Sequence, residues 1–152
     1  MSTAKDLKRL RWADHGAKIF STCGKRQYMA LIFDAEGHLI GEGYNGSPPG
    51  MPHCVDGFCP RFVNDAPADR LGDYDNCVST HAELNALIHS PRKPGSELVV
   101  NGSPCWGCAK AIASAQIHRL VCAVDESDHG WDRIKELLTD ANVLISEYDL
   151  TA

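Results

Sequence analysis

After residue 79 the sequence alternates between segments of helical periodicity and short apolar runs. The helical segments predict helices at 80–90, 104–115 and 130–140, and the apolar runs between and after them predict strands at 97–101, 118–124 and 142–148. Strands that alternate with helices are joined by crossover connections, which make neighbouring strands parallel. This alternation restricts the chain to an α/β fold.

The N-terminal half adds a helix and a hairpin. Apolar residues at helical spacing predict a helix over residues 3–21, and "MALIFD" (29–34) and "HLIGEGY" (38–44) flank a Gly-containing turn. The sequence thus predicts a three-layer α/β/α fold, with a mixed five-stranded sheet flanked by helices, formed as a single domain over residues 1–152. Residues 45–76 show no sustained period and predict a long functional or metal-clipped loop.

The composition limits the partners that we expect. The formal net charge is -5, so the chain offers no electrostatic match for a nucleic-acid polymer, although a local basic pocket can hold one phosphate. We find no apolar run typical of a secretory signal or a membrane span. The expectation is a cytoplasmic protein that binds no nucleic acid polymer and no membrane, with a nucleoside or mononucleotide ligand left open.

The cysteines point to metal binding. The chain contains 7 of them, and without a secretion signal clustered Cys and His indicate a metal site more readily than disulfides. In "SPCWGC" (103–108), Ser103 suits a helix cap and Pro104 the first helical position, which would place Cys105 and Cys108 on one face of the first turn. The positive end of the helix dipole favours the thiolates that zinc binds. Alone, the motif also fits a redox pair or half of a structural zinc site.

A histidine and a glutamate extend this motif. His81 precedes Cys105 by one predicted helix and one predicted strand, so a crossover can bring the two helix starts together. Ligands of His-Cys-Cys type leave a fourth tetrahedral position for water, as in catalytic zinc sites. "HAE" followed by "PCWGC" resembles the signature of zinc deaminases, in which the residue matching Glu83 transfers protons. The alternatives are a capping box of Thr80 and Glu83, and a packed or surface imidazole at His81.

Several segments together resemble the deoxycytidylate deaminases of bacteria, phages and eukaryotes. They are "STCGKRQ" (21–27), "GYNGSPPGMPHC" (43–54), "HAELNALI" (81–88) and "SPCWGCAKAIASAQIHRLV" (103–121). The resemblance implies a cytidine deaminase-like fold and zinc-dependent hydrolytic deamination of dCMP to dUMP and ammonia, in pyrimidine deoxynucleotide metabolism. It assigns His81, Cys105 and Cys108 to Zn²⁺, and Glu83 to proton transfer, first as a base and then as an acid.

The resemblance also implies properties of the assembly. Similar enzymes form homo-oligomers, of which a hexamer is favoured here, and many are activated by dCTP and inhibited by dTTP. The segment "GYNGSPPG" (43–50) resembles their effector segment. Mg²⁺ is expected to accompany a dCTP effector.

Contacts to the substrate are expected from residues in and around these motifs. Asn45 follows the second predicted strand, and similar enzymes use the matching Asn for substrate contact; the alternative is a plain Asn-Gly turn. Ala82 is also expected to contact the substrate. Arg26 and Arg92 are the candidates for the phosphate, and solvated surface charge is the alternative for each.

A second, structural zinc is implied by the remaining cysteines. Ligands in several similar deaminases match Cys23 and Cys54, and His53 with Cys77 or Cys59 completes a set of four. Such a metal clip would offset the entropy that is lost when the long loop closes.

The chain also departs from the family pattern. It has "YMA" at 28–30, where "VGA" is frequent, and "DESDHGW" at 125–131, in a loop that can approach the nucleotide. Other zinc deaminase substrates stay open: cytidine or deoxycytidine, 5-substituted dCMP, guanine and a tRNA adenosine. The alternative outside enzymes is a catalytically idle zinc scaffold. Glu83 separates the two, because a scaffold has no use for a proton shuttle.

Overall fold

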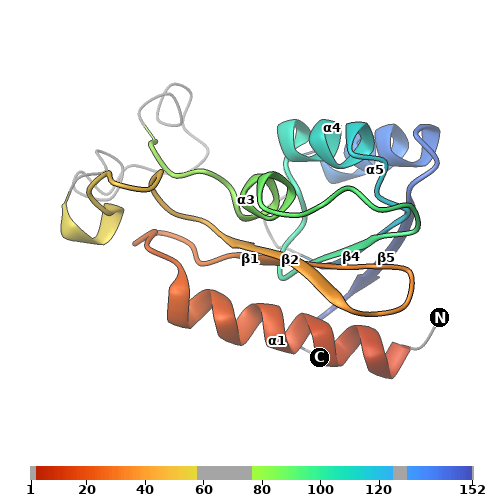
Figure 1. The fold of residues 1–152 in the computed structure, drawn as a ribbon, viewed down its shortest axis with the longest axis horizontal. Helices are drawn as coiled ribbons and strands as arrows, with labels where there is room; N and C mark the ends of the chain where they lie inside the picture. The colour runs from red at the N-terminus through yellow and green to blue at the C-terminus, as the bar shows by residue number, and fades with distance from the viewer. Residues whose placement is uncertain (1–2, 58–76, 125–129, 152) are drawn as a thin grey trace.

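The computed structural model describes residues 3–57, 77–124 and 130–151 (Figure 1). Residue 59 and the other residues outside these ranges are therefore not part of the description. The elements follow one another as α1 (Thr3–Phe20), β1 (Met29–Phe33), β2 (Leu39–Tyr44), the 3₁₀ turn η1 (Cys54–Asp56), α3 (Ala82–Ile88), β3 (Glu97–Val100), α4 (Trp106–Ser114), β4 (Arg119–Ala123), α5 (Trp131–Asp140) and β5 (Leu144–Tyr148).

The strands form one five-stranded mixed sheet in the order β2-β1-β3-β4-β5. β1 is antiparallel to both β2 and β3, whereas β3, β4 and β5 are parallel to one another. At the turn of the opening hairpin, the Asp34 carboxylate accepts hydrogen bonds from the backbone N–H groups of Glu36 and His38 at 3.0 and 2.9 Å. The predicted mixed sheet is confirmed.

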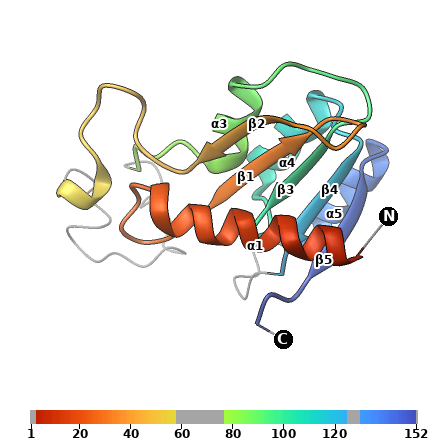
Figure 2. The same ribbon diagram turned by 60° about the horizontal axis from the view of Figure 1, so that its bottom comes forward.

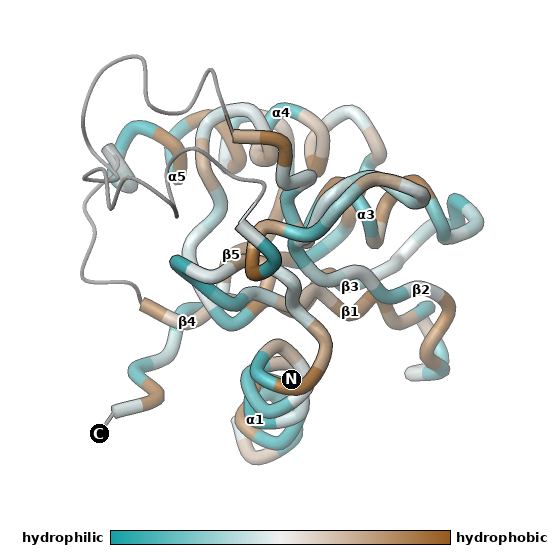
Figure 3. Tube along the Cα trace, turned by 90° about the vertical axis from the view of Figure 1, so that its left-hand side faces the viewer, coloured by the Kyte–Doolittle hydropathy of each residue, from teal (hydrophilic) through white to brown (hydrophobic). Residues whose placement is uncertain are grey.

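Helices cover both faces of this sheet. α1 lies along one face, and α3, α4 and α5 lie on the other (Figure 1). The turned view in Figure 2 shows α1 crossing in front of the strands, and Figure 3 shows the same helix nearly end-on below the sheet, with α4 at the opposite side. The predicted three-layer α/β/α arrangement is confirmed.

Alternation along the central strands produces two hydrophobic cores. Leu31, Val99 and Val121 pack with Leu10 of α1 on one face. Their sequence neighbours point the opposite way, because successive strand residues alternate between faces. The core on that side includes Ile32, Leu98, Leu120, Ala86, Ile112, Ile134 and Leu138.

A buried charged network joins α1 to the sheet. The guanidinium of Arg119 in β4 donates two hydrogen bonds, at 2.7 and 2.9 Å, to the carboxylate of Asp6, and it also pairs with Glu97 in β3. Tyr148 in β5 donates a further hydrogen bond to Asp6 at 2.7 Å. Asp6 and Arg119 are 1% and 3% exposed. The hydrogen bonds of the network therefore take the place of the water that these two buried charges have lost.

Two helix starts differ from the predicted caps. The N-cap residue of α4 is Cys105, with extended backbone angles, and Trp106 is the first helical residue; the assignment of Ser103 and Pro104 to these positions was wrong. α3 likewise begins after His81 rather than Thr80. Thr80 instead exchanges backbone hydrogen bonds with Gly46, at 2.8 and 3.2 Å. That bridge keeps the chain extended up to His81 and delays the start of the helix.

No helix in the described part of the chain combines the length and the apolar character that crossing a membrane requires.

Candidate metal centre and its cavity

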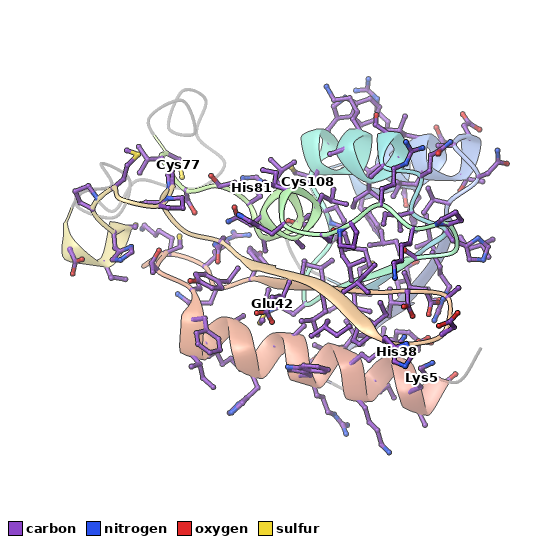
Figure 4. All side chains as sticks on the ribbon, viewed as in Figure 1. Lys5, His38, Glu42, Cys77, His81 and Cys108 are labelled. Carbon is purple, nitrogen blue, oxygen red and sulfur yellow. The ribbon has the colours of Figure 1, made fainter. Side chains whose placement is uncertain are left out.

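Three potential metal ligands converge where α3 and α4 begin. The Nδ1 atom of His81 lies 3.5 Å from the Sγ atom of Cys105 and 3.4 Å from that of Cys108. Figure 4 shows His81 and Cys108 close together near the start of α3. The chain runs from the end of α3 through β3 to the start of α4. The end of α3 therefore lies near the amino end of β3, and the starts of α3 and α4 both lie near its carboxyl end. The predicted crossover therefore brings the motif's two halves together.

The donor set fits a zinc ion. Tetrahedral ligands about 2.0–2.3 Å from one zinc ion lie roughly 3.5 Å apart, which is the separation of the imidazole nitrogen from the two sulfur atoms. All three ligand atoms lie within 4.8 Å of one another. One other such group occurs in the described ranges: Asp34, Glu36 and His38 on the β1–β2 turn. Two of its members are exposed, and its Asp34 carboxylate already faces the Lys93 ammonium group at 3.9 Å.

The protonation of the cluster also suits a cation. Hydrogen bonding from the Cys108 thiol lowers the pKa of Cys105 to about 3, although burial opposes this effect. The same hydrogen bond, together with burial, raises the pKa of Cys108. The hydrogen bond with Cys105 raises the pKa of His81 against the effect of burial. A metal ion would replace the protons of these groups, because it binds thiolate and neutral imidazole.

Glu83 lies beside these ligands. Its side chain is 7% exposed, and its Oε2 atom is 3.7 Å from the Sγ atom of Cys108. Burial raises the pKa of the Glu83 carboxyl. The capping-box alternative is wrong, because Thr80, its required partner, is not the N-cap residue of α3. The carboxyl group therefore faces the metal centre and is not half of a capping box.

A cavity of about 410 Å³ opens onto this centre. Its walls come from the segment between α1 and β1, the end of β2, and the starts of α3 and α4. They include four of the predicted residues with substrate or catalytic roles, Arg26, Asn45, Ala82 and Glu83. They also include Cys23, Lys25, Tyr28, Cys77, Ser79, Ser103 and Trp106, in addition to the ligands His81 and Cys105.

Arg92 lies elsewhere. It is exposed beyond the other end of α3 and lines a separate cavity of about 40 Å³, together with Lys93. The structure brings Arg26 to the cavity at the metal centre and does not bring Arg92 there.

Asn45 is held firmly in the cavity wall. Its side-chain oxygen accepts hydrogen bonds from the Tyr28 N–H group at 2.9 Å and from the Ser21 hydroxyl, and its amide group donates to the Arg26 carbonyl at 2.8 Å. The plain-turn alternative does not account for these contacts. The remaining amide hydrogen can still donate to a ligand, since an Asn side chain carries two.

The residues predicted for a second metal site are brought together in part. Cys23 and Cys54 are buried against each other, and the Gly24 N–H group donates to the Cys54 sulfur at 3.5 Å. His53 is exposed and Cys77 lines the main cavity. In the part of the chain that the structure describes, no third ligand atom joins Cys23 and Cys54. Cys59 lies outside that part.

Several residues of the cavity wall were not predicted from the sequence, among them Lys25, Tyr28, Ser79 and Trp106. The Ser79 hydroxyl is buried without a hydrogen-bond partner in the described structure, and Trp106 presents a large ring beside the ligands. Both sit within or next to the motifs, in "STHAE" and "PCWGC". Their closeness in sequence to a metal ligand was the available signal, but closeness in sequence does not show which side chains face the cavity.

The fold and the His-Cys-Cys cluster define a zinc-binding class of α/β proteins, and comparison with known proteins defines the family. Residues 3–124 match the family model described as the cytidine and deoxycytidylate deaminase zinc-binding region. The chain belongs to this family.

Particular relatives agree with this placement. The chain is 39% identical over 107 residues to the deoxycytidylate deaminase of Mycobacterium phage D29, an alignment that covers 66% of this chain and 80% of the relative. It is 31% identical over 140 residues to the deoxycytidylate deaminase of Enterobacteria phage T4, covering 70% and 72%. A crystal structure of the dCMP deaminase from cyanophage S-TIM5, in complex with dCMP and dUMP, has a similar fold. It gives a TM-score of 0.73 at 23% identity and covers 97% of this chain and 99% of that one.

Proposed function

We propose that the protein is a zinc-dependent deaminase that hydrolyses dCMP to dUMP and ammonia. The single observation that carries the proposal is the position of the Glu83 carboxyl beside the converging His81, Cys105 and Cys108 side chains, at the base of a cavity. The relatives named deoxycytidylate deaminase support dCMP as the substrate. A catalytically idle scaffold would gain nothing from a buried carboxyl at this place, because burying it without function costs free energy.

The residues present support a division of labour. His81, Cys105 and Cys108 would hold the zinc ion, which supplies a Lewis acid that makes a water molecule acidic near neutral pH. Glu83 accepts a proton from this water and delivers it to N3 of the pyrimidine ring. The water oxygen adds to C4 in the same step. Glu83 then takes the second proton from that oxygen and gives it to the amino nitrogen, so that the C4–N bond breaks and ammonia leaves while C4 keeps the oxygen as a carbonyl.

Other cavity residues would bind and orient the nucleotide. Ala82 lies between a ligand and the proton shuttle, where its backbone can meet the base. Asn45 is oriented by its hydrogen bonds and keeps one amide hydrogen for the sugar or the base. Arg26 is the predicted candidate for the phosphate that lies in the cavity wall, and Lys25 beside it is a second cation there. The buried Ser79 hydroxyl gains its missing partner if the substrate offers an acceptor or a donor.

The wider assignments are part of the same proposal. They comprise a single domain, a homo-oligomer with a hexamer favoured, a cytoplasmic location, and regulation by dCTP with Mg²⁺ and by dTTP. A second zinc would be bound by Cys23 and Cys54, with two further ligands from His53, Cys59 and Cys77. The contact between Cys23 and Cys54 supports this site.

A substrate panel tests the proposed activity. Purified protein should release ammonia from dCMP much faster than from deoxycytidine, CMP, guanine or a triphosphate, with and without dCTP and dTTP. Equal rates on dCMP and deoxycytidine would contradict the proposed contact between the protein and the phosphate. Release from guanine alone would move the activity to another branch of the zinc deaminases, and release from no member of the panel would favour a scaffold.

A further inference from the structure

An aromatic ring stands directly beside the metal centre. Trp106 is the first residue of α4, between the N-cap residue Cys105 and the ligand Cys108. Its side chain lines the cavity and is 37% exposed. The next residue is Gly107, and a Cβ atom placed there would meet nothing within 4 Å. The indole of Trp106 is therefore the large apolar surface that α4 contributes to the cavity.

A cation fixes this ring from outside the cavity. The guanidinium of Arg133, in the first turn of α5, lies over the Trp106 ring, 4.5 Å from its centroid. In residues 3–57, 77–124 and 130–151, no ion pair competes for this guanidinium. Guanidinium groups are attracted to the face of an indole at this distance. The contact orients a side chain that lines the cavity and is partly exposed.

We propose that Trp106 is a specificity-determining residue, which packs its indole against the bound nucleotide, and that Arg133 is a positioning residue that holds this ring in place. The proposal rests on the proposed function, because it takes a pyrimidine nucleotide as the ligand of the cavity. Aromatic rings bind bases through their faces, and small-molecule sites combine such apolar walls with a few oriented polar groups. Here the polar groups come from the segment before β1, the end of β2 and the start of α3, and the apolar wall comes from α4.

The expected effects separate binding from chemistry. Trp106→Ala should raise KM for dCMP about 10-fold, because stacking on an aromatic side chain contributes strongly to base binding. It should change kcat less than about threefold, because Glu83 and the ligands remain in place. Trp106→Phe keeps a ring and should recover most of the loss. Arg133→Gln should raise KM about threefold, in line with an exposed cation–π contact.

Matched control variants lie on the opposite face of the sheet. Trp12 in α1 is 48% exposed and packs edge-on against Phe33, at a centroid distance of 6.0 Å. Trp12→Ala and Arg11→Gln remove the same side-chain types far from the cavity and should leave KM unchanged. A KM that rises equally in the Trp12 and Trp106 variants would overturn the proposal.

Fluorescence gives a readout that does not depend on turnover. The chain contains 3 Trp residues, so titration of the zinc-loaded protein with dUMP reports on the ring directly. The emission change should persist in Trp12→Phe and in Trp131→Phe, and it should be lost in Trp106→Phe. A change that persists in Trp106→Phe would place the nucleotide away from this ring. If the substrate panel instead shows no activity on dCMP while dUMP still alters Trp106 emission, the proposed function fails and the ring assignment stands.

Discussion

The Glu83 side chain combines burial with proximity to a metal centre. Replacement by Gln keeps its size and its place in α3 while removing the group that accepts a proton. We expect Glu83→Gln to lower kcat on dCMP by about 10²–10⁴-fold, the usual contribution of general acid–base catalysis. Zinc content, measured by elemental analysis, should stay unchanged, because Glu83 is not one of the three converging ligands. Normal turnover in this variant would show that Glu83 does not transfer protons in the reaction.

Ser79 offers a second test with single residues. Its hydroxyl is buried, has no partner in the described structure, and belongs to the wall of the cavity. Ser79→Ala should raise KM for dCMP by about 3–10-fold, the value of one hydrogen bond to a ligand. The free energy of unfolding should not fall, because the change removes an unsatisfied polar group and breaks no existing bond.

Ser47 provides the matched control for this experiment. Its hydroxyl is also buried without a partner, but it does not line the cavity. Ser47→Ala should leave KM unchanged in steady-state assays without effectors. Equal changes in KM for the two variants would show that Ser79 acts through the local fold and not through the ligand.

At this scale the sequence predicted the convergence of His81, Cys105 and Cys108 beside Glu83, because the chemistry of zinc deamination requires these residue types at this spacing. It could not rank Arg26 against Arg92. Both are cations in polar segments, and only the packing of the elements places the segment before β1 beside the start of α3 and leaves Arg92 beyond its other end. The same holds for Ser79 and Trp106, whose orientation depends on the residues where the helices begin.

The helices position the metal centre through the residues at which they begin. The sequence predicted the order and type of the helices and strands, because hydrophobic periodicity depends on many residues at once. The caps were wrong, because each depends on one or two residues and on tertiary pairing. The bridge between Gly46 and Thr80 holds the chain extended until His81. His81 is therefore the N-cap residue of α3, and Cys105 holds the same position in α4, so each can point past its helix end toward the metal centre.

The approach of α3 to β2 provides a prediction for a single element. A Cβ atom on Gly43 would lie 2.3 Å from the backbone nitrogen of Ala86 and 2.6 Å from the carbonyl oxygen of Ala82. Gly43→Ala must push α3 away from the sheet, and α3 carries both His81 and Glu83. We expect the free energy of unfolding in urea to fall by about 1–3 kcal/mol, as in other overpacked interiors.

The control for this prediction also replaces a glycine in the described structure. A Cβ atom on Gly107 would meet nothing within 4 Å, and Gly107 lies in the first turn of α4. Gly107→Ala should leave the free energy of unfolding unchanged or raise it slightly, since Ala is the better helix former. Equal destabilisation by the two substitutions would show that the close contact of β2 with α3 is not the cause.

For the whole molecule, the buried charges decide how α1 is attached. The hydrogen bonds from Arg119 and Tyr148 hold the pKa of Asp6 below its usual value, although burial acts in the opposite direction. Asp6→Asn leaves the buried guanidinium of Arg119 with one carboxylate partner instead of two. We expect this change to lower the free energy of unfolding by about 3 kcal/mol, a value typical of a buried pair that loses one member.

The same pair sets part of the acid sensitivity. Because the pKa of Asp6 is lower in the folded state, the unfolded chain takes up the proton first as the pH falls. The contribution of Asp6 to stability is therefore complete above a pH of about 4, the ordinary value for Asp, and it is lost as the pH falls further through the folded-state value. Urea unfolding at a series of pH values should show a shallower acid loss for Asp6→Asn than for the wild type. Parallel curves would mean that other groups account for the acid sensitivity.

This network was not predicted from the sequence. Asp6, Glu97 and Arg119 lie in three elements far apart along the chain, and each alone resembles an ordinary surface charge. Only the stacking of α1 across β3 and β4 brings them together in a buried place. The hydrophobic pattern predicts that such layers form, but it does not specify which polar residues are enclosed between them.

The second metal site is the remaining question at the scale of the whole chain. Cys23 follows α1 and Cys54 follows β2, so their contact ties two long connections together. A metal ion at this point would stabilise both connections by closing a loop that is otherwise costly to order. Elemental analysis of the full chain should find about two zinc ions per chain, one of them at the His-Cys-Cys centre. Cys54→Ser should lose one of them and keep measurable turnover, whereas Cys122→Ala, which changes a cysteine of the β4 core, should keep both. A wild-type protein that binds a single zinc ion would show that Cys23 and Cys54 are packed as ordinary apolar side chains.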